Sequence, residues 1–496
     1  MFSPPLNALL LFTLTTPGVG LLAYRLGRKR LVELYTSLGF IVALLFLQII
    51  HGEVSANGPI VITSGFTPSF PVGVCLAIDA LSVFMATVYT VIGLIATIYS
   101  IRYMGGDTGL PGYYTLLLGI TTAMIGVVFA GDLFTLFIFW EVMCLCSYAL
   151  VAFRKESWEP VEAGYKYLIM SGAGSLTVLF AISILYGMTG TLNIALLSKA
   201  LAGSGGPWMY LTLTMIITGF GLQAGMAPLH TWLPDAHSAA PAPVSAVLSG
   251  AMVMTGVYGL FRILPLIFIP LQGAWRMTLA IFAVATMFTG NLMALLQDDV
   301  KRLLAFSTVA NIGYILLGLS TRSLLGLTGG LFHILNHAIV KALLFLCAGS
   351  FTYQARTRSL KELEGIGRRM PVTGALFILA TVAIAGIPPL NLFWSEWTIL
   401  MAGVEENMMM FSILMVVNLV LSAAYCIRLI QTILLKGETQ TSMEATEAPV
   451  PMLLPTLALG TLCIVIGLYP GPFRTAAEEA ARAALDIQAY FGIVLG

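Results

Sequence analysis

Long apolar runs separated by short polar loops dominate this chain. A helix needs roughly 20 apolar residues to cross the hydrocarbon core of a bilayer. Runs of about that length predict membrane spans near 5–24, 31–50, 76–101, 113–131, 133–152, 164–186, 208–226, 241–266, 274–296, 303–320, 324–350, 371–402, 408–434 and 452–469. The pattern therefore predicts an all-α polytopic membrane protein with about 14 transmembrane helices.

Two segments outside these runs have patterns of their own. The loop at 51–74 contains β-branched residues, Gly and Pro, which predicts a small hairpin. The tail at 473–496 mixes Glu478, Glu479 and Arg482 with Ala, Leu and Ile, a pattern typical of an interfacial amphipathic helix.

The composition excludes several classes of protein. Of the 496 residues, 58% are hydrophobic and 9% are charged, whereas a soluble domain carries about 25% charged residues. This excludes a soluble enzyme, a nucleic-acid binder and a disordered chain. The net charge of +1 implies no partner of opposite charge.

The cysteines indicate no metal or redox centre. All six lie in or beside apolar runs, and none has the spacing of zinc or iron–sulfur ligands. Cys144 and Cys146 stand two residues apart, so on a helix they point in different directions. We interpret the cysteines as small buried apolar residues.

Lysine and arginine fix the predicted orientation, because cytoplasmic loops carry an excess of both. The first apolar run precedes a basic cluster, so it is interpreted as a membrane helix with a cytoplasmic exit rather than a cleaved signal. Both termini are then predicted to be extracytoplasmic in a cell-membrane protein. The even-numbered loops hold only Lys199, Arg276 and Arg322, and the cytoplasmic cations are Arg25, Arg28, Lys29, Arg30, Arg102, Arg154, Lys155, Lys301, Arg302, Arg356, Arg358, Lys361, Arg368, Arg369 and Lys436.

Ionisable residues inside apolar runs are the candidate functional groups, since a charge at the bilayer centre costs at least about 2.5–3.5 kcal/mol. They are Asp79, Glu141, Lys166, His333, His337, Lys341, Glu396 and Arg428. Glu141 is interpreted as a carboxylate that carries protons, with Lys166 as the cation that tunes it. A purely structural Glu141–Lys166 ion pair, or a Lys166 that reaches the interface, remains open.

His333, His337 and Lys341 are spaced by four, which places them on one face of a helix. Two imidazoles and an amine along one face predict a proton relay, because histidine titrates near neutral pH. Structural hydrogen bonding and a metal site completed by Glu396 are the alternatives. Glu396 is the candidate terminus of the relay, and Arg428 is interpreted as structural.

Two similar segments predict helix breaks within the membrane. They are GMAPL at 225–229 and GIPPL at 386–390, and broken helices in two halves of a chain point to a transport site. A chance match between two short Gly- and Pro-containing segments is the alternative.

Five motifs together resemble the antiporter-like subunits of membrane complexes. They are FTLFIFWEVM around Glu141, and the segments at 219–262, 297–318, 332–350 and 386–397. This family includes the large proton-pumping subunits of complex I, the large subunits of multisubunit Na+/H+ antiporters and subunits of group 4 membrane-bound hydrogenases. The resemblance spans roughly 75–435, and HTWLPDAHSAAPAPVSAVLSG is most similar to the hydrogenase-type branch.

The resemblance implies a fold of about 14 helices with two inverted five-helix repeats and two broken helices. It divides the chain into N-terminal helices at 1–112, a first repeat at 113–272, a second repeat at 273–436 and a C-terminal helix with its tail at 437–496.

The resemblance also implies roles for the candidates. Glu141 corresponds to the glutamate of the fifth helix and Glu396 to the ionisable residue of the broken twelfth helix. The central axis would contain His333, His337 and Lys341.

The chain departs from the family pattern at two positions. Gln223 stands where the broken seventh helix usually has lysine, and Met254 replaces the usual lysine of the eighth helix. Neither side chain titrates near neutral pH. Retained proton conduction through Lys166 or a water chain at Gln223, conduction of another ion, and loss of translocation all remain open.

We therefore predict an ion-translocating subunit, for protons or sodium, of a redox-driven membrane complex. A non-redox Na+/H+ antiporter subunit and a non-conducting structural subunit are the alternatives. The chain has no cofactor motif, so iron–sulfur clusters, with or without nickel–iron, are expected in partner subunits. The loops at 297–302 and 356–369 are candidate contacts with membrane or peripheral partners, or ordinary solvated loops.

Overall fold

The computed structural model describes residues 29–64, 73–486 and 490. In this part of the chain, eleven helical segments are long and apolar enough to cross a membrane. They are α2 (Lys29–Asn57), α3 (Ala80–Tyr103), α4 (Leu110–Phe129), α5 (Leu133–Val151), α6 (Trp158–Thr189), α10–η1–α11 (Ala242–Val247, Leu248–Met252, Val253–Ile267), η2–α12 (Ile269–Leu271, Gln272–Leu295), α13 (Val300–Thr321), α14 (Leu324–Ala355), α18–η3 (Met409–Ile430, Gln431–Leu435) and α20 (Val450–Leu468). The predicted span at 5–24 lies outside the described residues.

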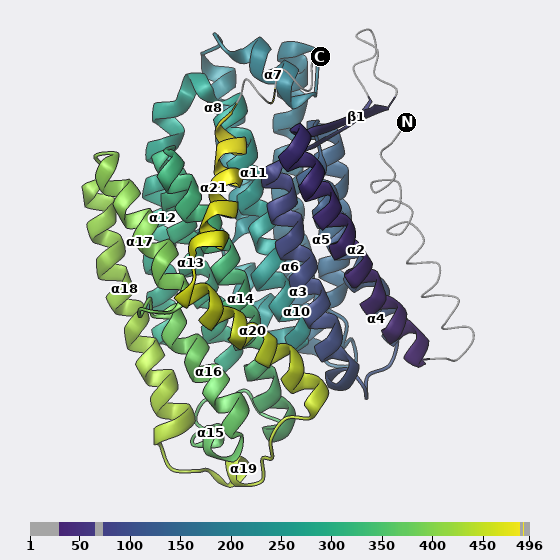
Figure 1. The fold of residues 1–496 in the computed structure, drawn as a ribbon, viewed down its shortest axis with the longest axis vertical. Coiled ribbons are helices and arrows are strands. Elements are labelled where there is room, and N and C mark those ends of the chain that lie inside the picture. Colours follow the sequence, from purple (N-terminus) through teal and green to yellow (C-terminus); the bar gives the residue numbers. More distant parts are fainter. Residues whose placement is uncertain (1–28, 65–72, 487–489, 491–496) are drawn as a thin grey trace.

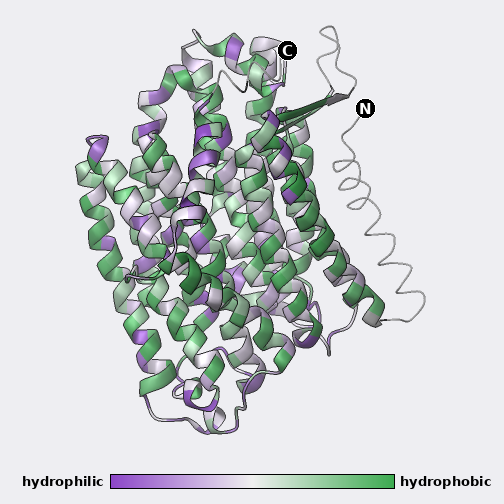
Figure 2. Cartoon of the chain, in the orientation of Figure 1, coloured by the Kyte–Doolittle hydropathy of each residue, from purple (hydrophilic) through white to green (hydrophobic). Residues whose placement is uncertain are grey.

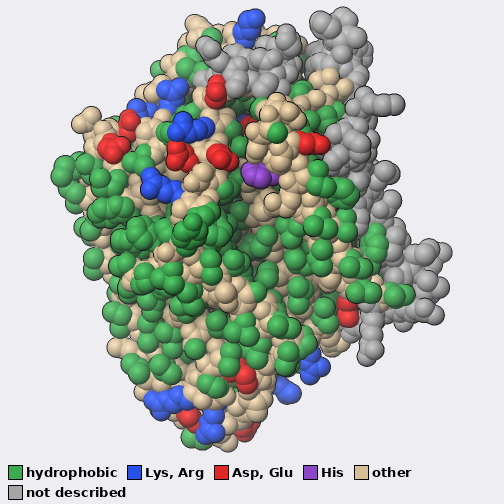
Figure 3. Space-filling view, in the orientation of Figure 1, with side chains coloured by type: hydrophobic (Ala, Val, Ile, Leu, Met, Phe, Trp, Pro, Cys, Tyr) green, Lys and Arg blue, Asp and Glu red, His purple; other side chains and the backbone are tan. Residues whose placement is uncertain are grey.

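The helices form an upright bundle with two distinct ends (Figure 1). One end, here called the hairpin end, carries β1 (Ile60–Ser64), β2 (Val74–Ile78) and α7 (Ile194–Leu201). The other, called the basic end, carries α15 (Ile366–Arg369) and α19 (Gln440–Met443). Apolar residues dominate the middle of the bundle in Figure 2, and Figure 3 shows charged side chains gathered towards both ends. This distribution is the one expected of a protein that crosses a bilayer. Those loops predicted to be cytoplasmic that fall within the described residues lie at the basic end.

Two helices are broken where the Gly- and Pro-containing segments predicted it. The first break separates α8 (Pro207–Ala224) from α9 (Trp232–Ala239), and the second separates α16 (Pro371–Ile384) from α17 (Asn391–Glu405). Gly225 and Gly386 adopt φ values of 73° and 69°, which non-glycine residues rarely do. Each break also contains a cis X–Pro peptide bond.

The centre of the bundle consists of α11, α13 and α14. The α10–η1–α11 and α13 segments are buried along their whole apolar length, and α14 nearly so. The stripe of ionisable residues predicted on α14 is therefore enclosed by protein rather than by lipid.

The hairpin and the tail helix both form. β1 and β2 pair antiparallel with Ile60 opposite Ile78, so the hairpin prediction is confirmed. The tail forms α21 (Gly471–Leu485), which packs on α3, α11 and α14. Its buried face consists of small residues, namely Ala477, Ala480, Ala481 and Ala484. The tail is thus a helix, but it packs on the protein rather than lying on a membrane surface alone.

A buried ion pair joins α3 to α11 near the hairpin end. The Arg262 guanidinium donates to both carboxylate oxygens of Asp79, at 2.6 and 2.7 Å. Asp79 also caps α3 by accepting the Ser82 backbone N–H at 2.9 Å. Burial penalises an isolated carboxylate, and the guanidinium and the hydrogen bonds offset this penalty for Asp79. This pair explains the Asp79 carboxylate, which the sequence had marked as unusual.

Candidate ion-conducting site

The predicted stripe on α14 faces two neighbouring helices. His333, His337 and Lys341 are all fully buried. The His333 ring contacts the Ser395 hydroxyl of α17 at 3.0 Å through Nδ1. Through Nε2 it contacts the Asn311 side-chain oxygen of α13 at 3.0 Å. The stripe therefore meets α13 and the second broken helix.

His337 is the least satisfied group of this stripe. In the described part of the chain, neither of its ring nitrogens has a hydrogen-bond partner. Its ring centroid lies 6.3 Å from that of His333. Buried polar groups are normally paired, so an unpaired imidazole in a core calls for an explanation.

Lys341 completes the stripe on the side of the basic end. Its Nζ donates to the Leu304 carbonyl at 3.1 Å and to the Ser307 hydroxyl, both on α13. No carboxylate lies within ion-pair distance of Lys341 among the described residues. The amine is thus held by neutral oxygens and not by a carboxylate.

Glu396 lies at the second helix break. Only 2% of its surface is exposed, and Oε1 has no hydrogen-bond partner within the described ranges. A Cβ atom on Gly386 would collide with Oε2, so the carboxyl group packs directly against the break. Ser395, the residue before it, bonds His333. No group of three His, Cys, Asp or Glu residues that could hold a metal occurs in the described part of the chain.

The first broken helix carries a different, uncharged cluster. Gln223 is buried at the end of α8, where its amide oxygen accepts from Ser171 at 2.6 Å. Its amide nitrogen donates to the Tyr167 hydroxyl at 3.0 Å and contacts Met252 Sδ at 2.9 Å. Tyr167 in turn accepts from Ser147 at 3.0 Å. The position that the family pattern gives to lysine is thus occupied by a hydrogen-bonded amide, and Met254 is buried in α11.

Lys166 does not pair with Glu141, so the interpretation of Lys166 as the cation that tunes Glu141 is wrong, whereas the alternative in which Lys166 reaches the surface fits the structure. Glu141 is half-buried on α5, and its Oε1 has no partner among the residues described. Lys166 is exposed and pairs instead with Glu162 at 2.9 Å and Asp235 at 3.4 Å. The reason is that α6 begins at Trp158, which places Lys166 towards the basic end, where its ammonium reaches carboxylates at the surface.

A five-residue π-helical segment, η1, lies between the two clusters. Met252 of η1 contacts Gln223, whereas Ser249 faces His337 and shares a hydrogen bond of 2.7 Å with Thr308. A Cβ on Gly250 would lie 3.1 Å from the Ala338 carbonyl oxygen, so η1 and α14 are in close contact. Single π-helical turns occur often at functional sites. The sequence carries no signal for this segment.

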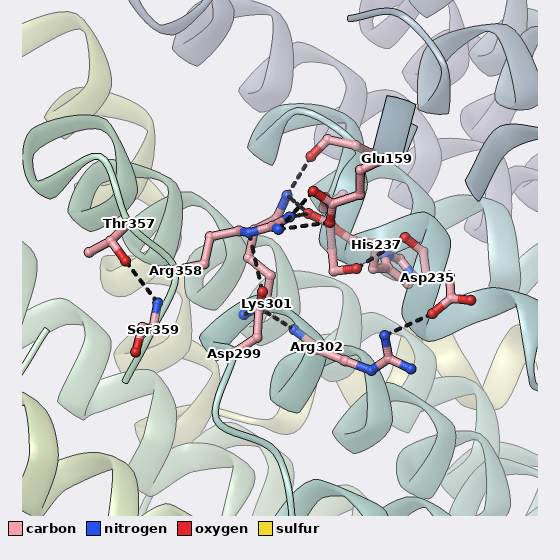
Figure 4. A network of polar contacts seen from close by, with 12 residues as sticks. Glu159, Asp235, His237, Asp299, Lys301, Arg302, Thr357, Arg358 and Ser359 are labelled. Atoms are coloured by element: carbon pink, nitrogen blue, oxygen red, sulfur yellow. Dashed lines mark hydrogen bonds and ion pairs between the residues drawn. The ribbon is translucent and has the colours of Figure 1, made fainter. Parts of the chain in front are cut away.

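The structure adds a polar network that sequence reasoning missed (Figure 4). Lys301, which was counted as a loop cation, is only 3% exposed and donates to the carbonyls of Ser238 and Ala240. His237 lies beside it, fully buried. The only sequence signal was a histidine within the motif DAHSAAP, which the interpretation did not use.

Neighbouring charges in the candidate loops are engaged within the chain itself. Arg428 donates to the Leu295 carbonyl at 2.8 Å and pairs with Asp298 at 2.6 Å. Arg302 pairs with Asp235 at 2.9 Å. These contacts fit the structural interpretation of Arg428, and the contact of these loops with partners stays a prediction.

Comparison with known proteins gives one consistent family. Residues 130–422 match the model of the "NADH:quinone oxidoreductase/Mrp antiporter, TM" family, and residues 66–114 match "NADH-Ubiquinone oxidoreductase (complex I), chain 5 N-terminus". The chain is 36% identical to NADH-quinone oxidoreductase subunit N of Desulforudis audaxviator over 82% of this chain and 84% of that protein.

Two solved structures are similar over nearly their whole length. A chain of the archaeal membrane-bound sulfane sulfur reductase, a respiratory complex, aligns with a TM-score of 0.87 and 29% identity over 99% of both chains. A chain of the Mrp complex of Dietzia sp. DQ12-45-1b aligns with a TM-score of 0.90 and 24% identity over 100% of both chains. The second likeness shows the shared fold.

Proposed function

Because this chain belongs to the family of NADH:quinone oxidoreductase and Mrp antiporter membrane subunits, we propose that it is a proton-translocating subunit of a redox-driven membrane complex. It is a multi-pass membrane protein of the antiporter-like fold. The single observation that carries the proposal is the enclosed line on α14. Imidazole and amine groups there are buried and lack carboxylate partners among the described residues, and His333 bonds Ser395, the residue before Glu396 at a helix break.

The second half of the chain would carry the translocation. His333, His337 and Lys341 form the line, and Glu396 stands beside Ser395 at its end. The first half has Gln223 where the family has lysine, and Glu141 lacks a cation among the described residues. We infer that the first half, with Glu141 and a hydroxyl cluster around Gln223 in place of lysine, supports translocation but is not a relay equivalent to the second half.

We propose that redox chemistry drives the complex, because similar proteins belong to redox-driven complexes. The similarity extends over most of an NADH-quinone oxidoreductase subunit, and over nearly all of a chain from a respiratory reductase. Iron–sulfur clusters, with or without nickel, would then reside in peripheral partner subunits. The complex would lie in the cell membrane with the basic end towards the cytoplasm and both termini outside.

Purification of the complex from native membranes in mild detergent, with mass spectrometry and metal analysis, tests the redox assignment. Soluble subunits carrying iron–sulfur clusters are the expected result. Small membrane subunits without metal would instead indicate a cation/proton antiporter assembly, and sodium would be the first ion to test.

Proton uptake by inside-out membrane vesicles, followed with a pH-sensitive dye, tests translocation. We expect Glu396→Gln to lower the uptake rate by about tenfold or more, because the amide cannot release a proton. Glu405→Gln, an exposed change at the end of the same helix α17, is the matched control. Uptake at the wild-type rate in Glu396→Gln would contradict the proposal.

A further inference from the structure

A lateral cavity separates α2 from the C-terminal helices. It has a volume of about 380 Å3, which lies within the range of about 300–1,000 Å3 that is typical of ligand sites. Side chains of α2, α3, α14, α20 and α21 form its walls. α2 packs mainly on α3 and α4, whereas α20 and α21 pack on α3 and α14. The cavity therefore lies where two groups of helices share α3 and leave a gap between them.

The cavity runs along α3 from the first turn of this helix towards the middle of the bundle. Ala80 and Ile92 both line it, and they lie about 18 Å apart along the helix at about 1.5 Å per residue. Half of the hydrocarbon core of a bilayer is about 15 Å thick. The inner wall includes Leu335 and Ile339 near the middle of α14. The cavity thus has the depth of one leaflet, which is the reach of a single acyl chain.

The inner walls are apolar, with side chains such as Val83 of α3 and Leu462 and Ile466 of α20. Thr87 is the exception, but its hydroxyl donates to the Val83 carbonyl at 2.8 Å and is satisfied within α3. Water in a protein interior needs two to four polar partners. The inner part of the cavity therefore suits an aliphatic chain better than a water chain or a polar solute.

Polar side chains line the cavity only where it meets the hairpin end. They include Gln48 and His51 of α2 and Glu479 of α21, and all three are exposed. Glu478, the residue before, pairs with Arg482 at 2.7 Å, whereas Glu479 forms no ion pair among the described residues. The amide and the imidazole can donate hydrogen bonds to a phosphate, and the carboxylate can accept hydrogen bonds from an ammonium.

The helix α2 fixes the height of this polar group in the membrane. It begins with Lys29 at the basic end and rises to the hairpin end (Figure 1). His51 lies about 33 Å further along the helix at about 1.5 Å per residue, whereas a hydrocarbon core is about 30 Å thick. With Lys29 at one surface of the core, His51 reaches the headgroups of the other. The cavity is thus apolar at the depth of lipid tails and polar at the depth of headgroups.

We propose that this cavity binds a phospholipid with an ethanolamine headgroup from the leaflet at the hairpin end. One acyl chain lies along α3 and ends beside α14. The headgroup ammonium donates to the Glu479 carboxylate, and the phosphate accepts from His51 and Gln48. The inference goes beyond the proposed function, because it assigns a lipid ligand to a part of the chain that does not belong to the line on α14.

The headgroup decides which lipid occupies the cavity. An acyl chain that leaves the bilayer for the cavity exchanges one apolar environment for another, so its burial contributes little free energy. Any phospholipid with a similar tail gains the same from the walls. The Glu479 carboxylate, by contrast, attracts an ammonium and repels a headgroup that carries only negative charge. A preference for ethanolamine over glycerol headgroups is therefore the distinguishing property of the site.

A transmembrane helix of a partner subunit is too large to be the occupant. Such a helix is a cylinder about 10 Å wide and 30 Å long, with a volume of roughly 2,400 Å3. The cavity offers about 380 Å3. A partner that packs over the opening would insert single side chains at most, and it would keep lipid out.

Photolabelling of the complete complex tests the proposal. Nanodiscs of phosphatidylglycerol receive a trace of a phospholipid with a diazirine in its acyl chain, with either an ethanolamine or a glycerol headgroup. Mass spectrometry then locates the labelled residues. We expect the ethanolamine probe to label α3 between Val83 and Ile92 and α14 near Leu335, and to do so about threefold more than the glycerol probe.

Equal labelling by the two probes would overturn the assignment of the headgroup. Labelling confined to the outer surface of the complex would overturn the whole proposal, because it would mean that no lipid enters the cavity. Cross-links from the cavity walls to a partner subunit instead of to lipid would overturn it as well.

Glu479→Gln removes the carboxylate at an exposed position, where the change leaves the fold intact. We expect labelling of α3 and α14 by the ethanolamine probe to fall to the level of the glycerol probe. Glu478→Gln is the matched control, since it makes the same change at the adjacent residue, which pairs with Arg482, and it should keep the preference. An unchanged preference in Glu479→Gln would contradict the role of this carboxylate.

Ala476→Phe tests the position of the acyl chain. Ala476 lines the cavity on α21, so a phenyl ring there fills part of the space, and we expect it to abolish labelling of α3 and α14 by both probes. Thr475→Phe, at the exposed neighbouring position, is the control and should label as the wild type does. Wild-type labelling in Ala476→Phe would place the acyl chain outside the cavity and refute the proposal.

Discussion

Replacing Gln223 by leucine removes the amide from the centre of the first cluster and keeps a side chain of similar size. The change breaks the 2.6 Å bond from Ser171 and the 3.0 Å bond to Tyr167. Tyr167 keeps Ser147 as a donor, but Ser171 is left in a buried position with only a 3.7 Å contact to Cys144 Sγ. An orphaned buried group costs about 1–3 kcal/mol, so we expect a destabilisation of this size.

Transport is expected to fall further in Gln223→Leu than in Gln223→Lys. Leucine interrupts the polar contacts that run from Ser147 through Tyr167 and Ser171 to the end of α8. Lysine can still donate to Tyr167. It also places a cation in the cluster, where Ser171 contacts Cys144, which lies one helical turn from Glu141. If loss of the polar contacts of Gln223 raises the free-energy barrier of the rate-limiting step by about 1.4 kcal/mol, transport slows about tenfold.

The assay is proton uptake in inside-out vesicles, with Gln440→Leu at the exposed start of α19 as the control. Thermal unfolding of the purified complex measures the stability change separately. Equal uptake rates for Gln223→Leu and Gln223→Lys would refute the reasoning and remove Gln223 from the mechanism.

The double variant Gln223→Lys/Glu141→Gln tests whether the new lysine pairs with Glu141. If the new lysine pairs with Glu141, removal of the carboxylate destabilises the lysine variant more than it destabilises the wild type.

Three further predictions follow from the charged residues. Glu141→Gln should lower proton uptake with little change in thermal stability, because Oε1 has no partner among the described residues; wild-type uptake would assign Glu141 a structural role. Lys166→Gln should leave uptake and the thermal unfolding temperature nearly unchanged, since it removes only exposed ion pairs; a loss of uptake as large as that of Glu141→Gln would argue for a functional pair. Arg262→Met should destabilise the complex by about 3–5 kcal/mol, because it leaves Asp79 buried and uncompensated. The double variant Asp79→Leu/Arg262→Met should lose less stability than the single one in a thermal-shift measurement, and an equal loss would contradict this account.

Hydrophobic length and backbone chemistry made much of the fold predictable. Apolar runs gave the positions of the long helices, because length and polarity alone decide which segments can span a bilayer. Gly225 and Gly386 marked the two breaks, since their positive φ values and the prolines that follow end a helix. The spacing of His333, His337 and Lys341 placed them on one face of α14, as observed.

Contacts between distant segments were not predictable from the sequence. Lys301 lies next to Asp299 and Arg302 in the chain and so resembles a solvated loop cation, yet its partners are carbonyls on α9. The position of Lys166 near the start of α6, close to the surface, decided that it meets Asp235 rather than Glu141. Neither fact has a local signal, because both depend on how helices pack.

The alanine face of α21 has a consequence for energy conversion. Its small residues let the helix lie close on α3, α11 and α14, beside a cavity of about 380 Å3 that also includes Leu335, Ala338 and Ile339 of α14. The side of α14 away from its histidines thus faces a wall of apolar groups. Such a wall acts as electrical insulation, because a low-dielectric layer keeps water and counter-ions away from the imidazoles. A complex that builds up a proton gradient needs such a barrier as much as it needs a proton path, because a leak would let protons flow back without being used.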